Sequence, residues 1–272
     1  MSLWSGERLE TNIVGRIAIE HLHRYALALN YVKNKIVLDI ACGEGYGSFL
    51  ISNKSKQVYG VDINEETIQF ASQKYKNNNL TFLKGSTSKI PLEDNTVEVI
   101  ISFETIEHHD EHDQMMLEIK RVLKPDGIVI MSSPDKLYYS DKRNYKNIFH
   151  VKELYKNEFK ILVEKYFNEV QMLSQTHING VSLILDEEKQ SSLEIYGGNF
   201  KRLKSEDKKP MFLVAILSDQ LMEINPISVF NGYEVDNDNL KYQERKIKST
   251  LTFKLGKFVL SPLVILKKIF KN

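Results

Sequence analysis

The chain has 272 residues and a net charge of +1, from 37 Lys plus Arg against 36 Asp plus Glu, so it offers no general field for nucleic acid, which we do not expect as a partner. Its single cysteine, Cys42, excludes intrachain disulfides and CxxC zinc sites and favours a reducing compartment. The first ten residues have no apolar signal core, and no segment reaches the ~20 apolar residues of a membrane span, so we expect a cytoplasmic protein.

Segments typical of helices and strands alternate from residue 15 to about 170. Helical spacing of apolar residues predicts a first helix over 15–30. The other patterns predict strands at 36–41, 57–62, 80–84, 98–102, 127–132, 169–174 and 211–217, and helices at 46–53, from 62 or 64 to 76, 113–123 and 151–166. Such alternation predicts a mostly parallel sheet, with ligands at the carboxyl ends of its strands.

The later chain is less regular. Residues 177–209 are polar and too long for a simple turn, so we interpret them as a lid or insertion. The C-terminus "KFVLSPLVILKKIFKN" combines lysines with an apolar strip that Pro262 breaks. It could lie on an anionic membrane surface, dock on its own domain or join two copies in a homodimer.

The most informative stretch is "VLDIACGEGYGS" at 37–48. A dinucleotide loop of the GxGxxG type would use Gly43 and Gly45, but Ser48 stands in the third glycine place. Asp39 would repel a pyrophosphate, whereas it suits a cationic ligand such as S-adenosylmethionine, directly or through the loop backbone. Asp62, at the end of the next strand, could accept hydrogen bonds from both ribose hydroxyls of either ligand.

Four motifs in order over residues 36–134 resemble the class I S-adenosylmethionine-dependent methyltransferases. They are the glycine loop, "VYGVDINEETIQFA", "LTFLKGSTSKIPLEDNTVEVIISFETIEHH" and "EIKRVLKPDGIVIMSSP". The resemblance implies a Rossmann-like α/β fold, with a seven-stranded, mostly parallel sheet whose last strand, "MFLVAIL", is antiparallel. We expect a methyltransferase domain over 1–220, with a cap helix at 15–30 and the insertion at 177–209, and an extension over 221–272.

The resemblance also implies which residues bind the cofactor, S-adenosylmethionine. They are Tyr25, Asp39, Ala41, Gly43, Gly45, Asp62, Ile63, Ser86, Thr87 and Phe103. Two of these positions depart from the family pattern. Ser86 stands near a place where many relatives have an aspartate for the adenine amino group, and Ala41 replaces a glycine, which a strand-like backbone would tolerate.

Glu104, His108 and His109 in "ETIEHHDEHD" are the candidate general bases for deprotonating an acceptor hydroxyl. The alternative is that they cap the next helix or are solvated. We assign no metal ligand, although His108 and His112 have the i, i+4 spacing of a metal pair.

Four further side chains have two interpretations each. The resemblance implies that Tyr25 or Arg24 reaches the methionine carboxylate of the cofactor, but both could belong to an amphipathic helix that packs on the core. His150 could face the acceptor, as could Tyr138 and Tyr139. Cys42 has no base partner in the pattern and is expected to be a small apolar filler.

The narrower likeness of "GERLE", "EHLHRYALA" and "NIFHVKELYKNEF" is to methyltransferases of bacterial surface-polysaccharide (O-antigen or capsule) gene clusters. It implies O-methylation of a sugar in a surface glycan or its precursor, with a glycan or small-molecule acceptor and a peripheral membrane location as one option. Three alternatives stay open: a small-molecule N- or C-methyltransferase, a non-catalytic cofactor-binding scaffold and a nicotinamide oxidoreductase, against which Asp39 and Ser48 count.

Overall fold

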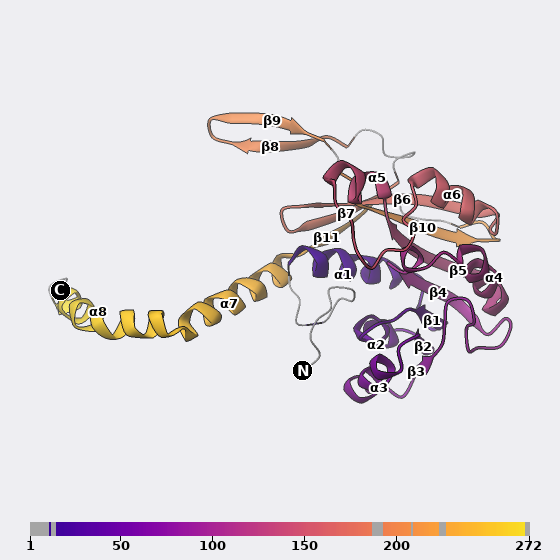
Figure 1. Cartoon of the computed structure of the whole chain (residues 1–272), viewed down its shortest axis with the longest axis horizontal. Helices are drawn as coiled ribbons and strands as arrows, with labels where there is room; N and C mark the ends of the chain where they lie inside the picture. Colours follow the sequence, from indigo (N-terminus) through magenta and orange to yellow (C-terminus); the bar gives the residue numbers. More distant parts are fainter. Residues whose placement is uncertain (1–10, 12–14, 187–192, 208, 223–226, 270–272) are drawn as a thin grey trace.

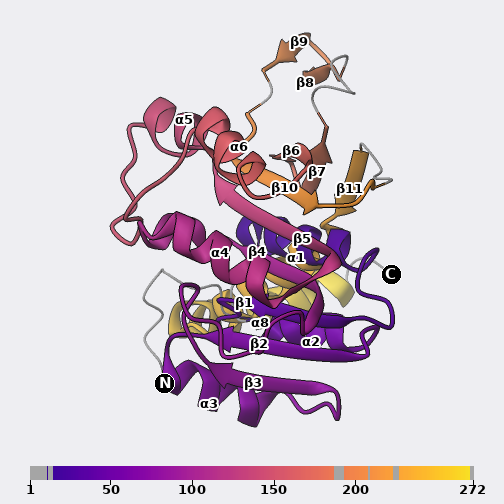
Figure 2. The same ribbon diagram turned by 90° about the vertical axis from the view of Figure 1, so that its right-hand side faces the viewer.

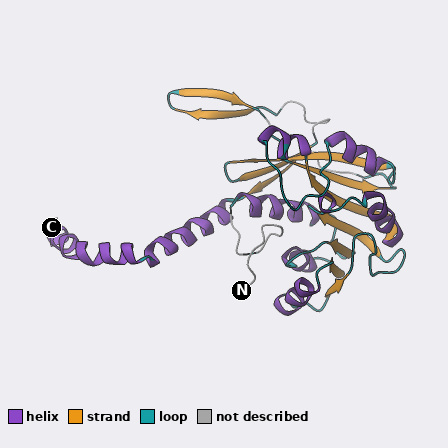
Figure 3. Ribbon diagram, in the orientation of Figure 1, coloured by secondary structure: helices purple, strands orange, loops and turns teal. Residues whose placement is uncertain are grey.

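The computed structural model describes residues 11, 15–186, 193–207, 209–222 and 227–269. They form a twisted sheet with helices on both faces, from which a hairpin and a long helical arm project (Figures 1 and 3). The segment 6–10, which carries "GERLE", and Lys271 lie outside the described residues.

Five parallel strands form the half of the sheet that carries the glycine loop. In spatial order they are β3 (Leu80–Lys84), β2 (Gln57–Asp62), β1 (Ile36–Ile40), β4 (Val97–Phe103) and β5 (Leu123–Pro134). All four contacts between neighbouring strands are parallel. Their apolar side chains are buried on both faces, as continuous apolar runs in a parallel sheet predict.

The predicted antiparallel strand is confirmed. β10 (Phe212–Ser218, part of "MFLVAIL") is completely buried and lies between β5 and β6 (Glu169–Ile178), antiparallel to both. β6 therefore runs in the same direction as β5, so six strands of this sheet are parallel to one another, as predicted.

The sheet has nine strands rather than seven. β7 (Val181–Leu185) pairs with β6, and β11 (Ile227–Asn231) pairs with β7, both antiparallel. The signal for β7 is Asn179–Gly180, two residues with positive φ (45° and 82°) that form a tight hairpin turn. β11 belongs to the segment 221–272, so the sheet extends into the predicted C-terminal extension.

The interpretation of 177–209 as an irregular segment is wrong for its described part. It contains β7 and a separate hairpin of β8 (Ile195–Asn199) and β9 (Arg202–Glu206), which projects from the body in Figure 1. Residues 187–192 and 208 lie outside the described residues. Polar side chains hid these strands because the hairpin packs on no apolar core: every residue of β9 is exposed.

The predicted helices are present as α1 (Arg16–Ala28), α2 (Tyr46–Ser52), α3 (Glu65–Lys74), α4 (His112–Val122) and α6 (Lys156–Glu164). Asn64 caps α3, since its side chain accepts the backbone N–H of Thr67 at 2.9 Å. α6 starts five residues later than predicted, because the Glu107 carbonyl accepts the N–H groups of Val151 and Lys152 and holds them outside the helix. Three short elements were not predicted: η1 (Ile106–His108), α5 (Lys136–Tyr139) and η2 (Asp141–Arg143).

The two faces of the sheet carry separate cores. α4 and α6 contribute Met115 and Phe159 to one, and α1 and α2 contribute Tyr25 and Ile51 to the other. Figure 2 shows α1 lying across the sheet, near the strands that bear the glycine loop.

The arm consists of α7 (Tyr233–Ser249) and α8 (Leu251–Ile269), and α8 continues past Pro262. No residue of α7 is buried. None of the helices in the described part of the chain is long and apolar enough to cross a membrane.

Gly47 in α2 should be the least replaceable residue of the glycine loop. A Cβ there would lie 1.9 Å from Cζ of Tyr25. We expect Gly47→Ala to lower the free energy of unfolding by about 1–3 kcal/mol or more, because overpacking forces the buried ring to move. Urea denaturation measures this. Gly256→Ala is the control, since a Cβ there meets nothing within 4 Å; equal stability of both variants would contradict the prediction.

Candidate functional site

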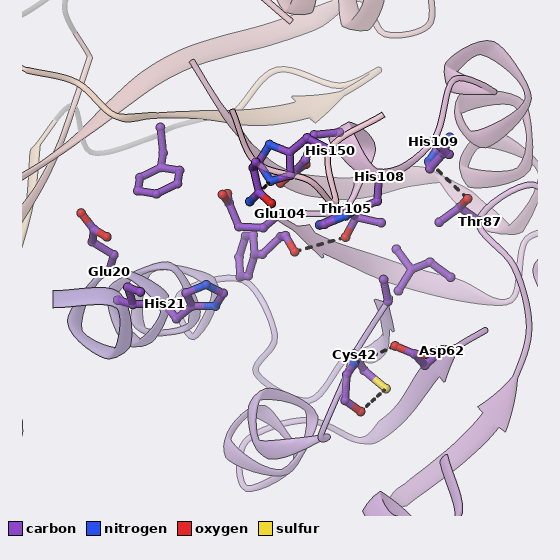
Figure 4. A pocket seen from close by; sticks show the side chains of 18 of the residues that line it. Glu20, His21, Cys42, Asp62, Thr87, Glu104, Thr105, His108, His109 and His150 are labelled. Atoms are coloured by element: carbon purple, nitrogen blue, oxygen red, sulfur yellow. Dashed lines mark hydrogen bonds between the residues drawn. The ribbon is translucent and has the colours of Figure 1, made fainter. Parts of the chain in front are cut away.

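A cavity of about 680 Å³ lies at the carboxyl ends of β1, β2 and β4 (Figure 4). This volume is in the range of about 300–1,000 Å³ that is typical of small-molecule sites. Most of the predicted site residues line it: Tyr25, Ala41, Gly43, Asp62, Ile63, Ser86, Thr87, Phe103, Glu104, His108 and His109. Asp39 and Gly45 do not, and their contributions are indirect.

Asp62 joins the glycine loop to the second strand. One carboxylate oxygen accepts the N–H of Gly43 at 3.0 Å, and the other accepts the N–H of Asn64 at 2.9 Å. The side chain is buried at the end of β2 and lines the cavity. Because a carboxylate oxygen accepts two hydrogen bonds, Asp62 can hold the loop and still accept from a ligand diol.

The loop itself has an unexpected backbone. Ala41 has a φ of 59°, so the expectation of a strand-like backbone there is wrong, and the alanine occupies a left-handed conformation that favours glycine. Gly45 has a φ of 87° and begins α2. A Cβ on Gly45 would lie 2.7 Å from the Phe82 ring, so this glycine shapes the loop from outside the cavity.

Asp39 acts beneath the loop. Its carboxylate accepts a hydrogen bond of 2.6 Å from Ser48 and two longer ones, both of 3.3 Å, from the Tyr25 hydroxyl. Direct contact with a ligand, one of the two predicted options, is therefore not what the structure shows. Ser48, which replaces the third glycine of a dinucleotide loop, is the partner of this acid. Burial raises the pKa of Asp39 to about 7, against the opposing effect of the Ser48 and Tyr25 hydrogen bonds.

Of the two α1 candidates for the methionine carboxylate, only Tyr25 lines the cavity. Arg24 is completely buried behind it, where its Nη1 donates to Gln175 Oε1 at 2.7 Å and its guanidinium lies 4.9 Å from the Phe212 ring centroid. His23 is structural: its ring nitrogens contact the hydroxyls of Ser182 and Ser228, both at 2.9 Å, which ties α1 to β7 and β11.

His109 lies with the residues expected to bind adenine. Its Nε2 is 3.3 Å from the hydroxyl of Thr87, the neighbour of Ser86 (Figure 4). Burial lowers the pKa of His109. This position separates His109 from Glu104 and His108, although the three are close in sequence.

Glu104 follows β4 with a φ of 52°, a strained conformation for glutamate. Its carboxylate accepts a hydrogen bond of 2.6 Å from Ser132 at the end of β5 and lies 3.7 Å from Nη1 of Arg24. Burial raises the pKa of Glu104, and the nearby Arg24 charge opposes this effect. A buried carboxylate of raised basicity at a strand end is suited to accept a proton.

The structure also brings together residues that the sequence left apart. Glu107, His108 and His150 meet at one end of the cavity, next to Glu104. His112 points elsewhere, because its Nε2 lies 2.8 Å from the carbonyl of His109, so the predicted spacing of His108 and His112 forms no pair. Four cavity residues were missed in the sequence: Glu107, Arg143, Tyr145 and Asn147. Only Glu107 had a signal, its place inside the quoted acidic run.

Cys42 behaves as the sequence predicted. It is buried, and burial raises the pKa of its thiol well above the ordinary value. A thiol in this state is a poor nucleophile. It fills space under the glycine loop.

The charges around the cavity favour a cationic ligand. Six carboxylic side chains line it, from Glu20, Glu44, Asp62, Glu104, Glu107 and Glu111, against two arginines, Arg16 and Arg143. Such a lining attracts the ammonium and sulfonium groups of S-adenosylmethionine and opposes a pyrophosphate. The residues present therefore fit this cofactor. Together, the fold and the site define a class I S-adenosylmethionine-dependent methyltransferase.

Comparisons with known proteins agree. A family described as "Methyltransferase domain" matches residues 32–210, and the chain belongs to this family of enzymes, with S-adenosylmethionine as its cofactor. Two solved structures share the fold, at TM-scores of 0.55 and 0.54 and 19% identity. They are the YcgJ protein of Bacillus subtilis, with 74% of this chain and 100% of that one covered, and a SAM-dependent methyltransferase of Archaeoglobus fulgidus, with 74% and 92% covered.

Three mycobacterial relatives are similar over shorter stretches. Proteins named "probable S-adenosylmethionine-dependent methyltransferase" from Mycolicibacterium smegmatis and Mycobacterium tuberculosis are 35% and 32% identical, covering 50% and 52% of this chain and 52% of each relative. A fatty-acid O-methyltransferase of M. smegmatis is 28% identical over 43% of each chain. The chain thus spans about half the length of these curated relatives, or less.

Asp39 should make the stability of the apoprotein depend on pH. Because the folded state raises its pKa from 3.8 to about 7, its contribution to stability is present below pH 3.8 and is lost as the pH rises to 7. At about 1.4 kcal/mol per pKa unit, the loss is on the order of 2–4 kcal/mol. Asp39→Asn keeps the shape without the ionisation, so the difference in unfolding free energy between variant and wild type should grow in favour of the variant from pH 4 to pH 7. Parallel urea-denaturation profiles would refute this.

Asp62 should decide cofactor affinity. Loss of two hydrogen bonds to a carboxylate, worth about 1.5–3 kcal/mol each, predicts that Asp62→Ala weakens S-adenosylmethionine and S-adenosylhomocysteine binding at least about 100-fold in calorimetric titration. Asp94→Ala is the matched control, because that exposed carboxylate bonds Arg121 away from the cavity. Binding of NADH instead of the two adenosyl compounds would overturn the assignment.

Proposed function

We propose that this protein transfers a methyl group from S-adenosylmethionine to a hydroxyl oxygen of a sugar, in a surface glycan or its precursor. The observation that carries the methyl-transfer part is the position of a buried carboxylate, Glu104, in the same cavity as the ribose-binding candidate Asp62. The cofactor end and a proton acceptor thus share one enclosed space.

The division of labour within the cavity follows from its lining. When bound, S-adenosylmethionine supplies a methyl carbon on a positively charged sulfur that leaves readily. Gly43 and Asp62 hold the adenosyl part from β1 and β2, while Ser86, Thr87 and His109 are placed for the adenine. The main task of the protein is then alignment, which can supply several kcal/mol of the barrier reduction.

Glu104 is the best placed of the three candidate bases. It lines the cavity at the end of β4, and Ser132 and Arg24 fix its carboxylate from behind. His109 lies on the adenine side. The Nδ1 atom of His108 is 3.0 Å from the carbonyl of Phe149, so His108 is oriented by the backbone and presents Nε2. Glu104 would accept the acceptor's hydroxyl proton as the oxygen attacks the methyl carbon.

The acceptor end has the composition of a sugar site. The Arg143 guanidinium lies 5.4 Å and 4.9 Å from the ring centroids of Tyr139 and Tyr145, and Asn147 donates towards His150 at 2.9 Å. Aromatic faces beside hydrogen-bonding side chains suit a ring that has both apolar faces and hydroxyls. This supports the sugar proposal and agrees with the predicted place of His150 and Tyr139 at the acceptor.

A lipid acceptor is the second candidate. The fatty-acid O-methyltransferase among the relatives supports it, as do the apolar side chains that α8 exposes, such as Leu255 and Phe258. In this version the arm would rest on an anionic membrane through Lys254 and Lys257. N- or C-methylation of a small molecule and a non-catalytic scaffold remain as outcomes of the same assay.

Glu104→Gln should lower kcat by about 100- to 10,000-fold with less than a few-fold change in the Kd of S-adenosylmethionine, because it removes a general base and leaves the adenosyl contacts intact. The measurement is transfer of a labelled methyl group to a panel of nucleotide sugars, glycans, fatty acids and amines. His109→Gln is the matched control and should change cofactor affinity more than kcat.

The panel also tests the acceptor class. Methylated sugar supports the proposal, whereas labelled fatty acid or amine would replace it with one of the alternatives. Tight binding of S-adenosylmethionine without transfer to any acceptor would indicate the scaffold. Wild-type turnover by Glu104→Gln would refute the role of Glu104.

A further inference from the structure

Two histidines and a glutamate meet in the wall of the cavity. One nitrogen or oxygen from each of Glu107, His108 and His150 lies within 4.8 Å of the other two. Glu107 and His108 belong to η1 after β4, and His150 comes from the loop before α6. The Glu107 carbonyl binds the N–H groups of Val151 and Lys152, and this contact brings the histidine to the other two residues.

Both imidazoles are held by their Nδ1 atoms. Nδ1 of His108 lies 3.0 Å from the carbonyl of Phe149, and Nδ1 of His150 lies 2.6 Å from a carboxylate oxygen of Glu153. These partners place the ring proton on Nδ1 in both residues. Each Nε2 then carries the lone pair. A histidine that ligates a metal usually has this arrangement, with its other nitrogen bonded to a carbonyl or carboxylate.

Glu107 supplies the independent sign of a missing ligand. The residue is 1% exposed, and its Oε2 atom is buried without a hydrogen-bond partner in the described part of the chain. A buried carboxylate oxygen without a partner is costly, and a cation removes that cost. The neighbouring carboxylates of Glu104 and Glu153 add negative charge, which the cations of Arg24 and Arg143 only partly balance.

We infer that Glu107, His108 and His150 bind one divalent transition-metal ion, of the Zn²⁺, Co²⁺ or Mn²⁺ type. Two imidazoles and a carboxylate suit these ions, whereas Mg²⁺ prefers oxygen ligands. Bonds of about 2.0–2.2 Å require the three atoms to move together slightly. His150 would also exchange the Asn147 amide, now 2.9 Å from its Nε2, for the metal.

The place of this site gives it a role in the proposed reaction. Three protein ligands leave open positions, and all three residues line the cavity beside Glu104. An acceptor hydroxyl bound to the ion loses its proton more readily. Glu104 takes that proton, a new O–C bond forms to the methyl carbon, and the electron pair of the broken C–S bond goes to sulfur, giving the methyl ether and S-adenosylhomocysteine. This role rests on the proposed function, but metal binding does not.

The test uses the full chain without a histidine tag, stripped with EDTA and dialysed. Titration with Co²⁺ and Zn²⁺, followed by calorimetry and by the visible spectrum of Co²⁺, should show one site per chain. Glu107→Gln and His150→Gln should each weaken binding at least 30-fold at unchanged melting temperature. His112→Gln is the matched control, because this nearby imidazole bonds the His109 carbonyl and lies outside the cluster; its affinity should equal that of the wild type.

The outcomes separate the two proposals. Absence of a site, or binding that survives Glu107→Gln and His150→Gln, overturns the metal inference. Methyl transfer to a hydroxyl at an undiminished rate in EDTA overturns the metal's role but leaves the proposed function standing. One metal ion bound at Glu107, His108 and His150 without transfer to any hydroxyl confirms the site and counts against the proposed function.

Discussion

The buried carboxylate of Asp39 is the contact on which the geometry of the cofactor end depends. It lies at the end of β1 and accepts hydrogen bonds from Ser48 of α2 and Tyr25 of α1. Three elements are therefore joined at one point beneath the glycine loop. The ring of Tyr25 occupies the space that a side chain on Gly47 would need, so the cap helix can close over the loop only if that position is glycine.

A second set of buried charges organises the opposite end of the cavity. Arg24 is fully buried between Gln175, Glu104 and the Phe212 ring, and it spans the distance from α1 to the ends of β4 and β6. Burying charges is expensive unless each has a partner, so such a cluster costs stability. Glu104 adds backbone strain to this cost. Expense of this kind concentrates at functional sites, because a reactive group must be held before its substrate arrives.

Much of the fold could be predicted because its signals are local. Apolar runs placed the five parallel strands, and "MFLVAIL" was long and apolar enough to show a strand buried on both faces. The edge strands escaped prediction because polar residues cover them and only the turn Asn179–Gly180 marked the hairpin. At the site, Asp62 and Gly43 were predictable from spacing along one strand–loop–helix unit, whereas Arg143, Tyr145 and Asn147 lie in an irregular segment that has no periodic pattern.

By itself, the sequence determined the alternation of strands and helices, the acid before the glycine loop and hence the class of cofactor, because these depend on residues close together along the chain. The tertiary structure decided what each side chain touches. It put Asp39 under the loop instead of in the cavity, gave Ala41 a left-handed backbone, moved His109 to the adenine side and brought His150 to Glu107 and His108. The physical reason is that these contacts join segments tens of residues apart, and only the packing of helices and loops around the sheet sets their distance.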